Sequence, residues 1–236
     1  MQHRIHGLIG YAIRATDGDL GKVHDFYFDD ATWTIRYMVA ETGSWLSGRK
    51  VLISPVAMGK PDEGSHAFPV NLTRVQVSDS PDIDTEKPVY RQHEAKLHEY
   101  YQWPPYWEGG YGGIFGITSS PVFEIPVVEK SPDSEQRDDP HLRSTRQVTG
   151  YHIKAIDGEI GHVADFIVDD ENWTLPYMVV DTGNWLPGKK LLISPQRIKS
   201  VNWVDASVSL DRMRDSIKNS SELDSLNPDY NKKPSF

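Results

Sequence analysis

A long internal repeat constrains this chain more than any other sequence feature. Residues 10–55 align with residues 150–195 without a gap at an offset of 140, and 27 of the 46 aligned positions are identical. This period is far longer than a solenoid unit, so each copy is large enough to form a core of its own. We therefore expect two similar small domains. The predicted boundaries are a first repeat at 1–87, a connecting region at 88–141, a second repeat at 142–224 and a tail at 225–236.

The side-chain pattern inside each copy predicts β-strands. Residues 23–28 and 34–39 alternate with a period of two and are rich in aromatic and β-branched residues. Asp-Gly pairs mark hairpin turns, and Thr73 and Asp211 are candidate N-caps of short helices that follow the strands, the second helix being the longer (211–219 against 73–79). The fold class is thus mainly β, with two tandem small antiparallel β-barrels, each with a short helix.

A set of residues recurs in register in both copies, and we interpret it as structural. The tryptophans are expected to fill the core or plug the barrels, with inter-domain packing or a partner surface as the alternative. A mid-strand aspartate is unexpected, and we interpret each as a satisfied, partly exposed side chain. The repeated residues are Gly18, Gly21, Asp25, Trp33, Gly43 and Trp45, and then Gly158, Gly161, Asp165, Trp173, Gly183 and Trp185.

Composition excludes several classes of protein. The chain has no cysteine, which removes disulfides, thiol catalysis and thiolate metal sites. Its net charge of −9 gives it no basic face, so nucleic acid is not expected as the main partner. No segment has the roughly 18–20 apolar residues of a membrane span, and the first residues lack the apolar core of a signal peptide. A soluble, cytoplasmic protein is expected.

The connecting region contains the most specific candidate for a protein-interaction site. Residues 90–101 form a predicted helix, and the sequence after it is rich in Trp, Tyr, Pro and Gly, while residues 129–141 have the composition of a linker. Large aromatic residues are enriched at protein interfaces. Two alternatives are that these residues cover the barrel they follow, or that they fill the seam between the barrels. The candidate interaction residues are Tyr100, Tyr101, Trp103, Tyr106, Trp107 and Tyr111.

Comparison of the two copies does not support a catalytic or metal-binding site. His24 aligns with Ala164, and His162 aligns with Lys22, so no histidine ligand recurs with the repeat. Ser54 and Ser194 do recur, but no histidine is repeated beside them and the glycines of a hydrolase elbow are missing. The acidic pairs at 29–30 and 169–170 are expected to form turns rather than a cation site. We expect no enzyme activity, no cofactor and no metal.

The repeated strings resemble the PRC-barrel family, which is named for the cytoplasmic domain of the photosynthetic reaction centre H subunit. They read G-Y-x-I-x-A-x-D-G-x-x-G-x-V-x-D-F, then D-D-x-x-W-T-x-x-Y-M-V, then T-G-x-W-L-x-G-x-K-x-L-I-S-P, and occur twice in tandem. The segment from Tyr100 to Trp107 is similar to one that follows the barrel in bacterial stand-alone members. The resemblance implies six-stranded barrels that bind other proteins, without a shared catalytic set. The H subunit's membrane helix has no counterpart here, and proton handling by Asp25 and Asp165, which that subunit suggests, is the less favoured alternative.

The function that we expect is therefore a non-enzymatic interaction or assembly module with an unidentified protein partner. The two barrels are predicted to pack as a pseudo-twofold pair, as a fused homodimer would. The alternative is a sensor that binds a small ligand or a metal in the cleft between the barrels.

Overall fold

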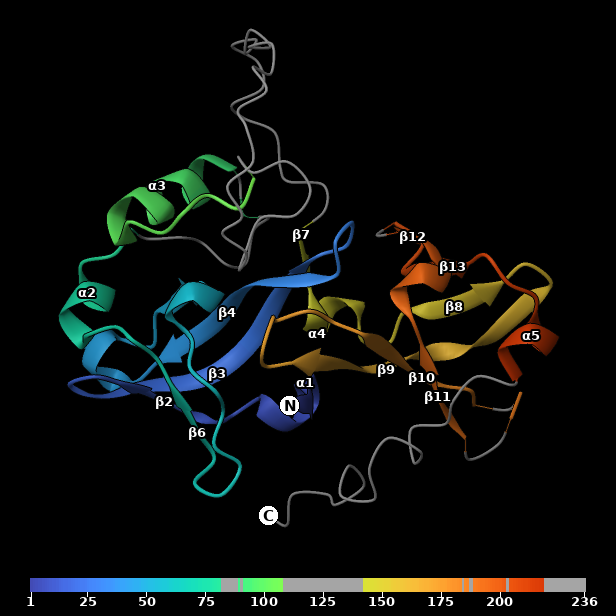
Figure 1. Ribbon diagram of the computed structural model, residues 1–236, viewed down its shortest axis with the longest axis horizontal. Coiled ribbons are helices and arrows are strands. Elements are labelled where there is room, and N and C mark those ends of the chain that lie inside the picture. The colour runs from blue at the N-terminus through green and yellow to red at the C-terminus, as the bar shows by residue number, and fades with distance from the viewer. Residues whose placement is uncertain are drawn as a thin grey trace, which may run out of the picture.

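The chain folds into a mainly β structure with two sheets and a few short helices (Figure 1). The computed structural model describes residues 1–81, 89, 91–107, 142–183, 185–186, 189–202 and 204–218. Most of the first sheet is drawn in blue and cyan, and most of the second in yellow and orange. Within the described residues, no helix is long and apolar enough to cross a membrane.

The first sheet has the hydrogen-bonded order β5-β4-β3-β2-β6, and β7 joins it by pairing with β3. These strands are β2 (Ala12–Ala15), β3 (Gly18–Asp29), β4 (Thr34–Thr42), β5 (Lys50–Ile53), β6 (Ala67–Pro69) and β7 (Leu142–Ser144). The predicted strands at 23–28 and 34–39 are confirmed as the paired parts of β3 and β4. The strand that completes this sheet comes from the start of the second repeat.

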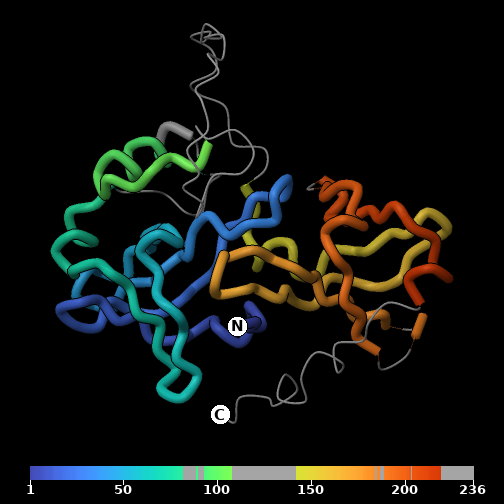
Figure 2. The backbone as a smooth tube through the Cα atoms, viewed as in Figure 1, coloured from blue at the N-terminus to red at the C-terminus, as the bar shows by residue number. Residues whose placement is uncertain are grey.

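The second sheet has the order β11-β10-β9-β8-β13-β12, and β1 joins it by pairing with β9. Its strands are β1 (Gln2–Arg4), β8 (His152–Ala155), β9 (Gly158–Asp169), β10 (Tyr177–Asp181), β11 (Lys190–Ile193), β12 (Ile198–Asn202) and β13 (Ser207–Leu210). The extra strand here comes from the start of the first repeat. Figure 2 shows the N-terminus in the middle of the molecule, as this exchange requires.

Short helices connect and cover the strands. They are α1 (Ile5–Leu8), α2 (Arg74–Ser78), α3 (Arg91–Tyr101), α4 (Thr145–Val148) and α5 (Arg214–Lys218), with 3-10 turns η1 (Ser44–Leu46), η2 (Pro55–Ala57) and η4 (Pro195–Arg197). The predicted helix at 90–101 is confirmed as α3, and the predicted cap Thr73 accepts a bond from the Gln76 amide. The prediction for Asp211 is wrong, because α5 begins at Arg214, and α2 and α5 have the same length of 5 residues.

Each sheet contains one parallel pair, which the antiparallel prediction did not include. β6 runs parallel to β2, and β13 runs parallel to β8. After β5 the chain passes through η2 and returns as β6 beside β2, and after β11 it passes through η4 and β12 and returns as β13 beside β8. Closure of each sheet into a barrel stays a prediction, since the hydrogen-bonded order of the strands forms an open path.

Gly21 and Gly161 show why a glycine recurs at this position of the repeat. Both have a positive φ, of 155° and 146°. A Cβ atom at either position would lie 2.0 Å from a backbone carbonyl oxygen of the neighbouring strand, that of Glu41 or Asp181. Only glycine lets β3 approach β4, and β9 approach β10, so closely.

One hydrophobic core runs through both sheets. Phe26, Phe28, Phe68 and Phe166 are fully buried, and Phe28 lies 5.4 Å from Phe166 between ring centroids. This contact joins residues of the two repeats, so the described parts of the repeats share one contiguous cluster.

Candidate functional site

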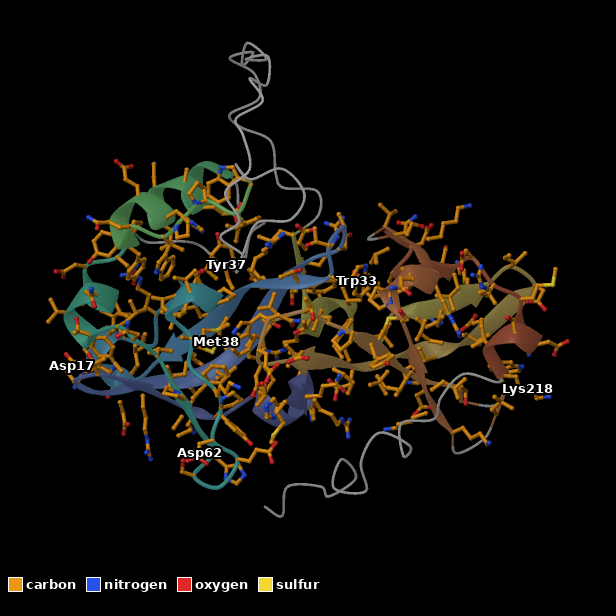
Figure 3. The ribbon with its side chains drawn as sticks, viewed as in Figure 1. Asp17, Trp33, Tyr37, Met38, Asp62 and Lys218 are labelled. Atoms are coloured by element: carbon orange, nitrogen blue, oxygen red, sulfur yellow. The ribbon has the colours of Figure 1, made fainter. Side chains whose placement is uncertain are left out.

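Two regions bring together half of the predicted site residues. The first is the seam, where the two repeats meet through residues 2–8, 25–35, 142–148 and 165–175. The second is the aromatic lobe, which consists of α3 and residues 103–107. Figure 3 labels Trp33 where the two sheets meet, and Tyr37 on the side of the first sheet that faces α3.

The two repeats exchange equivalent segments at the seam. We call residues 2–8 (β1 and α1) arm 1, and residues 142–148 (β7 and α4) arm 2. Arm 1 pairs with β9, with Gln2 opposite Asp169, and arm 2 pairs with β3, with Leu142 opposite Asp29. At the offset of 140 these are the same positions of the repeat. Each repeat therefore completes the sheet of the other.

Asp25 and Asp165 hold the helices of the exchanged arms. Asp165 accepts from the Arg4 Nε at 2.8 Å and from the His6 amide at 3.0 Å. Asp25 accepts from the hydroxyl groups of Ser144 and Thr145, and from the Arg146 amide at 3.2 Å.

The strand around each aspartate is shaped for this contact. The register of β3 against β4 shifts between Val23 and Asp25, and β9 shifts at the equivalent position. Such a bulge re-aims the side chain that follows it. Asp25 and Asp165 are 5% and 2% exposed, so the prediction of partly exposed aspartates was wrong. They are buried because their donors come from the other repeat, which the local sequence of the strand does not show.

The two aspartates of each acidic pair have different roles. The first aspartate makes the predicted turn, since Asp29 accepts from the amides of Ala31 and Thr32, and Asp169 accepts from the amide of Glu171. The second aspartate pairs with an arm. Asp30 accepts from Arg143 Nε at 2.7 Å, and Asp170 lies 3.0 Å from His3 Nε2.

Trp33 and Trp173 form the centre of the seam. The Ile35 amide donates to the Trp173 carbonyl, and the Leu175 amide donates to the Trp33 carbonyl, both at 2.8 Å. Thr34 and Thr174, which are equivalent positions, form an antiparallel bridge between them. Both tryptophans are buried and have positive φ values, 53° and 58°, which bulky residues rarely adopt. The reciprocal bonds account for this conformation.

Trp45 and Trp185 lie instead at the turns after β4 and β10, and each is covered by an arginine. The Arg74 guanidinium carbon lies 4.5 Å from the centre of the Trp45 ring, and that of Arg214 lies 5.3 Å from the Trp185 ring. The Trp45 indole also donates to the Leu20 carbonyl at 2.8 Å. Gly18 and Gly158 lie beside the same two arginines, and Gly43 and Gly183 lie in the loops that precede the tryptophans.

The aromatic lobe is attached to the first sheet by a buried polar network. Tyr37 on β4 donates to Glu94 Oε1 at 2.8 Å, and its hydroxyl lies 2.9 Å from His98 Nε2. Tyr106 donates to the same Glu94 oxygen at 2.6 Å. Tyr37, Glu94 and His98 are all buried, with Glu94 at 0% exposure. A network of this kind fixes the position of α3 on the sheet.

Hydrogen positions in this network follow from the partner of His98. Its Nδ1 lies 3.1 Å from the Pro104 carbonyl oxygen, which only accepts, so Nδ1 carries a hydrogen. Because Tyr37 donates to Glu94, the contact between its hydroxyl oxygen and Nε2 requires a hydrogen on Nε2 as well.

The predicted interaction residues divide between packing and exposure. Trp103 is buried and stacks on Tyr101 with ring centroids 4.2 Å apart, and burial raises the pKa of Tyr101 to about 12. Tyr106 lies under Arg36, whose guanidinium carbon is 4.0 Å from the centre of its ring. Tyr100 remains 38% exposed although its hydroxyl donates to the Gln76 carbonyl. Tyr111 lies outside the described residues.

The outer side of the lobe forms a shallow pocket of about 460 Å³. It lies between the second half of α3 and the segment after it. Its lining mixes aromatic, proline and polar side chains, from Ala95, His98, Glu99, Gln102, Trp103, Pro104, Pro105 and Trp107. Sequence reasoning identified Trp103 and Trp107 but missed Glu94 and His98, which carry no signal beyond their place on a predicted helix.

No metal site was found within the described residues, where no group of three or more His, Asp or Glu residues is placed to hold an ion. The seam and the lobe act in this structure through hydrogen bonds, ion pairs and aromatic contacts. What the arrangement provides is a two-repeat body with a shared core and an aromatic lobe on its first repeat.

Two comparisons relate the chain to known proteins. Residues 1–77 match the family model of the PRC-barrel domain. A protein of Deinococcus radiodurans that is named only as uncharacterized is 31% identical over 106 residues, which make up 40% of this chain. The match spans 38% of that protein's length. The family match includes arm 1, β2 to β6 and most of α2.

Proposed function

We propose that this chain is a non-enzymatic assembly module in which two PRC-barrel-like repeats, packed as a pseudo-twofold pair, present the aromatic lobe to another protein. PRC-barrel domains are typically interaction domains, and the first repeat matches that family. The family assignment of the second repeat rests on the 27 identities that it shares with the first.

The observation that carries the proposal is the aromatic lobe on the first repeat, where Arg36 covers Tyr106. Of the residues that anchor it, Tyr37 recurs as Tyr177, but at the position of Arg36 the second repeat has Pro176. The seam residues serve the fold in both copies alike. The lobe concentrates Trp and Tyr, which are enriched at protein interfaces.

The sensor alternative has less support from this geometry. It places a ligand in the cleft between the repeats, whereas the described residues at the seam are buried aromatic side chains in mutual contact, such as Trp33 and Phe166 at 6.5 Å. The two pockets that we describe lie elsewhere: one on the lobe, and one of about 300 Å³ beside β6.

The test is affinity capture from a lysate of the organism that encodes the chain. Trp107→Ala and Gln102→Arg change the outer side of the lobe without touching Glu94 or Tyr37. A partner protein retained by the wild type should be lost with both variants. Val204→Ala, at a position that is 95% exposed on the second repeat, is the matched control and should keep the partner. Equal recovery with all four proteins, or recovery of the bait alone, would contradict the proposal.

A further inference from the structure

The two exchanged arms are held at equivalent positions by different chemistry. Arm 2 is held by Arg143, which donates to Asp30 at 2.7 Å. At the same place in arm 1 stands His3, which lies 3.0 Å from Asp170. An arginine stays charged at every pH that a protein experiences, whereas a histidine changes its charge near neutral pH. The two halves of the seam therefore differ at this position in whether the side chain that meets the second aspartate can lose its charge.

His3 is placed between two carboxylates. Its Nδ1 lies 3.0 Å from Glu63 Oε1 and its Nε2 lies 3.0 Å from Asp170 Oδ2, while its side chain is 3% exposed. Ionised carboxylates only accept hydrogen bonds, so both ring nitrogens must carry a hydrogen for both contacts to form. The arrangement thus fits an imidazolium and not a neutral ring.

Other charged groups lie near His3 and its two partners. Asp169 ends β9 and Glu171 lies in the turn after it, and Lys60 from the loop of the first repeat pairs with Glu171 at 3.7 Å. On arm 1 itself, Arg4 is engaged by Asp165, and the amino group of Met1 contacts Asp170.

Asp170 remains ionised in this setting. Burial alone would raise the pKa of Asp170, but the hydrogen bonds from the amino terminus and from His3 outweigh it and lower that pKa below its usual range. The carboxylate that meets Nε2 of His3, directly after the end of β9, is therefore a charged acceptor throughout the neutral range.

We propose that His3 is a pH-dependent latch that holds arm 1 on β9 when it is protonated and loosens it when it is not. Loss of one proton turns a ring lone pair toward a carboxylate oxygen, and a hydrogen bond to a charged group is replaced by repulsion. Arm 2, which is held by Arg143, does not respond. The latch is independent of the aromatic lobe, and it releases the edge of β9 from residue 167 to residue 169.

Hydrogen exchange on the full chain at pH 6 and pH 8 tests the latch, once rates are corrected for the intrinsic effect of pH. The opening equilibrium of amides in β1 and in its partner residues on β9 should rise about tenfold at pH 8, the size expected for one charge-assisted hydrogen bond. Amides in β7 and its partners on β3 should show no such rise. No pH response of arm 1, or an equal response of both arms, would overturn the proposal.

Substitutions assign the effect to His3. His3→Arg should hold arm 1 at both pH values, and His3→Gln should leave an arm whose opening does not depend on pH. His6→Gln is the matched control, because His6 is an exposed histidine of the same arm, and it should keep the wild-type response. A pH response that persists in His3→Gln, or that disappears in His6→Gln, would contradict the latch. His3→Gln decides the matter even where His3→Arg fails to fold.

Discussion

The seam and the aromatic lobe both contain buried aromatic residues, but they differ in whether equivalent residues of the two repeats make the same contacts. At the seam, the Trp173 carbonyl accepts a hydrogen bond from the first repeat, and the Trp33 carbonyl accepts the equivalent bond from the second repeat. In the lobe, Tyr37 makes buried bonds to Glu94 and His98, while its equivalent Tyr177 is only partly buried. The comparison shows that equivalent residues close the seam in the same way in both copies, whereas one repeated residue, Tyr37, takes a further role as the anchor of the lobe.

The largest expected effect separates the shared seam from a pair of independent domains. Trp33→Ala and Trp173→Ala each remove a buried indole from the core that both repeats share, which should lower the free energy of unfolding by about 3–5 kcal/mol. Because the positions are equivalent, the two losses should be similar. Urea unfolding followed by circular dichroism measures them. A variant that unfolds one repeat and leaves the other at its wild-type stability would contradict the shared seam.

A smaller effect tests the one-sided lobe. Tyr37→Phe removes the hydroxyl that joins Glu94 to His98 and should cost about 1–3 kcal/mol, because it leaves buried polar groups without that partner. Tyr177→Phe is the matched control. Within the described residues, the Tyr177 hydroxyl makes no side-chain hydrogen bond, so its loss should cost less than about 0.5 kcal/mol. Equal costs for the two variants would remove the distinction between the copies.

The smallest effect appears at alkaline pH. Burial raises the pKa of Tyr101 to about 12, so the folded chain favours the neutral phenol. The stability that this provides is complete below the ordinary tyrosine pKa of about 10 and is lost as the pH rises toward 12. By pH 11 the loss should be about 1 kcal/mol, and Tyr101→Phe should not show it. Urea unfolding of both proteins at pH 9 and pH 11 measures the change. An equal fall in the free energy of unfolding in the wild type and in Tyr101→Phe would refute the assignment.

The strands could be predicted from the sequence because a period of two is a local property. Residues 23–28 carry it whatever they pack against, and Thr73 and Gln76 form a capping box from neighbouring positions. The parallel pair of β2 and β6 could not be predicted in this way. It depends on the path of the chain after β5, which no local pattern encodes.

The exchange of arms lay beyond sequence reasoning for a related reason. Arms 1 and 2 precede the aligned segments, and their sequences differ, so the repeat itself gave no sign of them. Asp25 was the residue that could have indicated the exchange. A carboxylate in the middle of a strand needs donors, and the donors were in the other repeat. Nor could Glu94 and His98 be singled out, because their partner Tyr37 is distant in sequence and reads as an ordinary strand residue.

Disulfide trapping tests the reciprocal exchange most directly, because the chain has no cysteine to interfere. Gln2→Cys with Asp169→Cys, and Leu142→Cys with Asp29→Cys, place pairs of cysteines at partner positions across the seam. Gln2→Cys with Asp29→Cys, and Leu142→Cys with Asp169→Cys, are the matched pairs for arms that stay on their own repeats. Mild oxidation followed by non-reducing electrophoresis and mass spectrometry should give intrachain links in the first two variants only. Links in the last two variants and not in the first two would contradict the exchange.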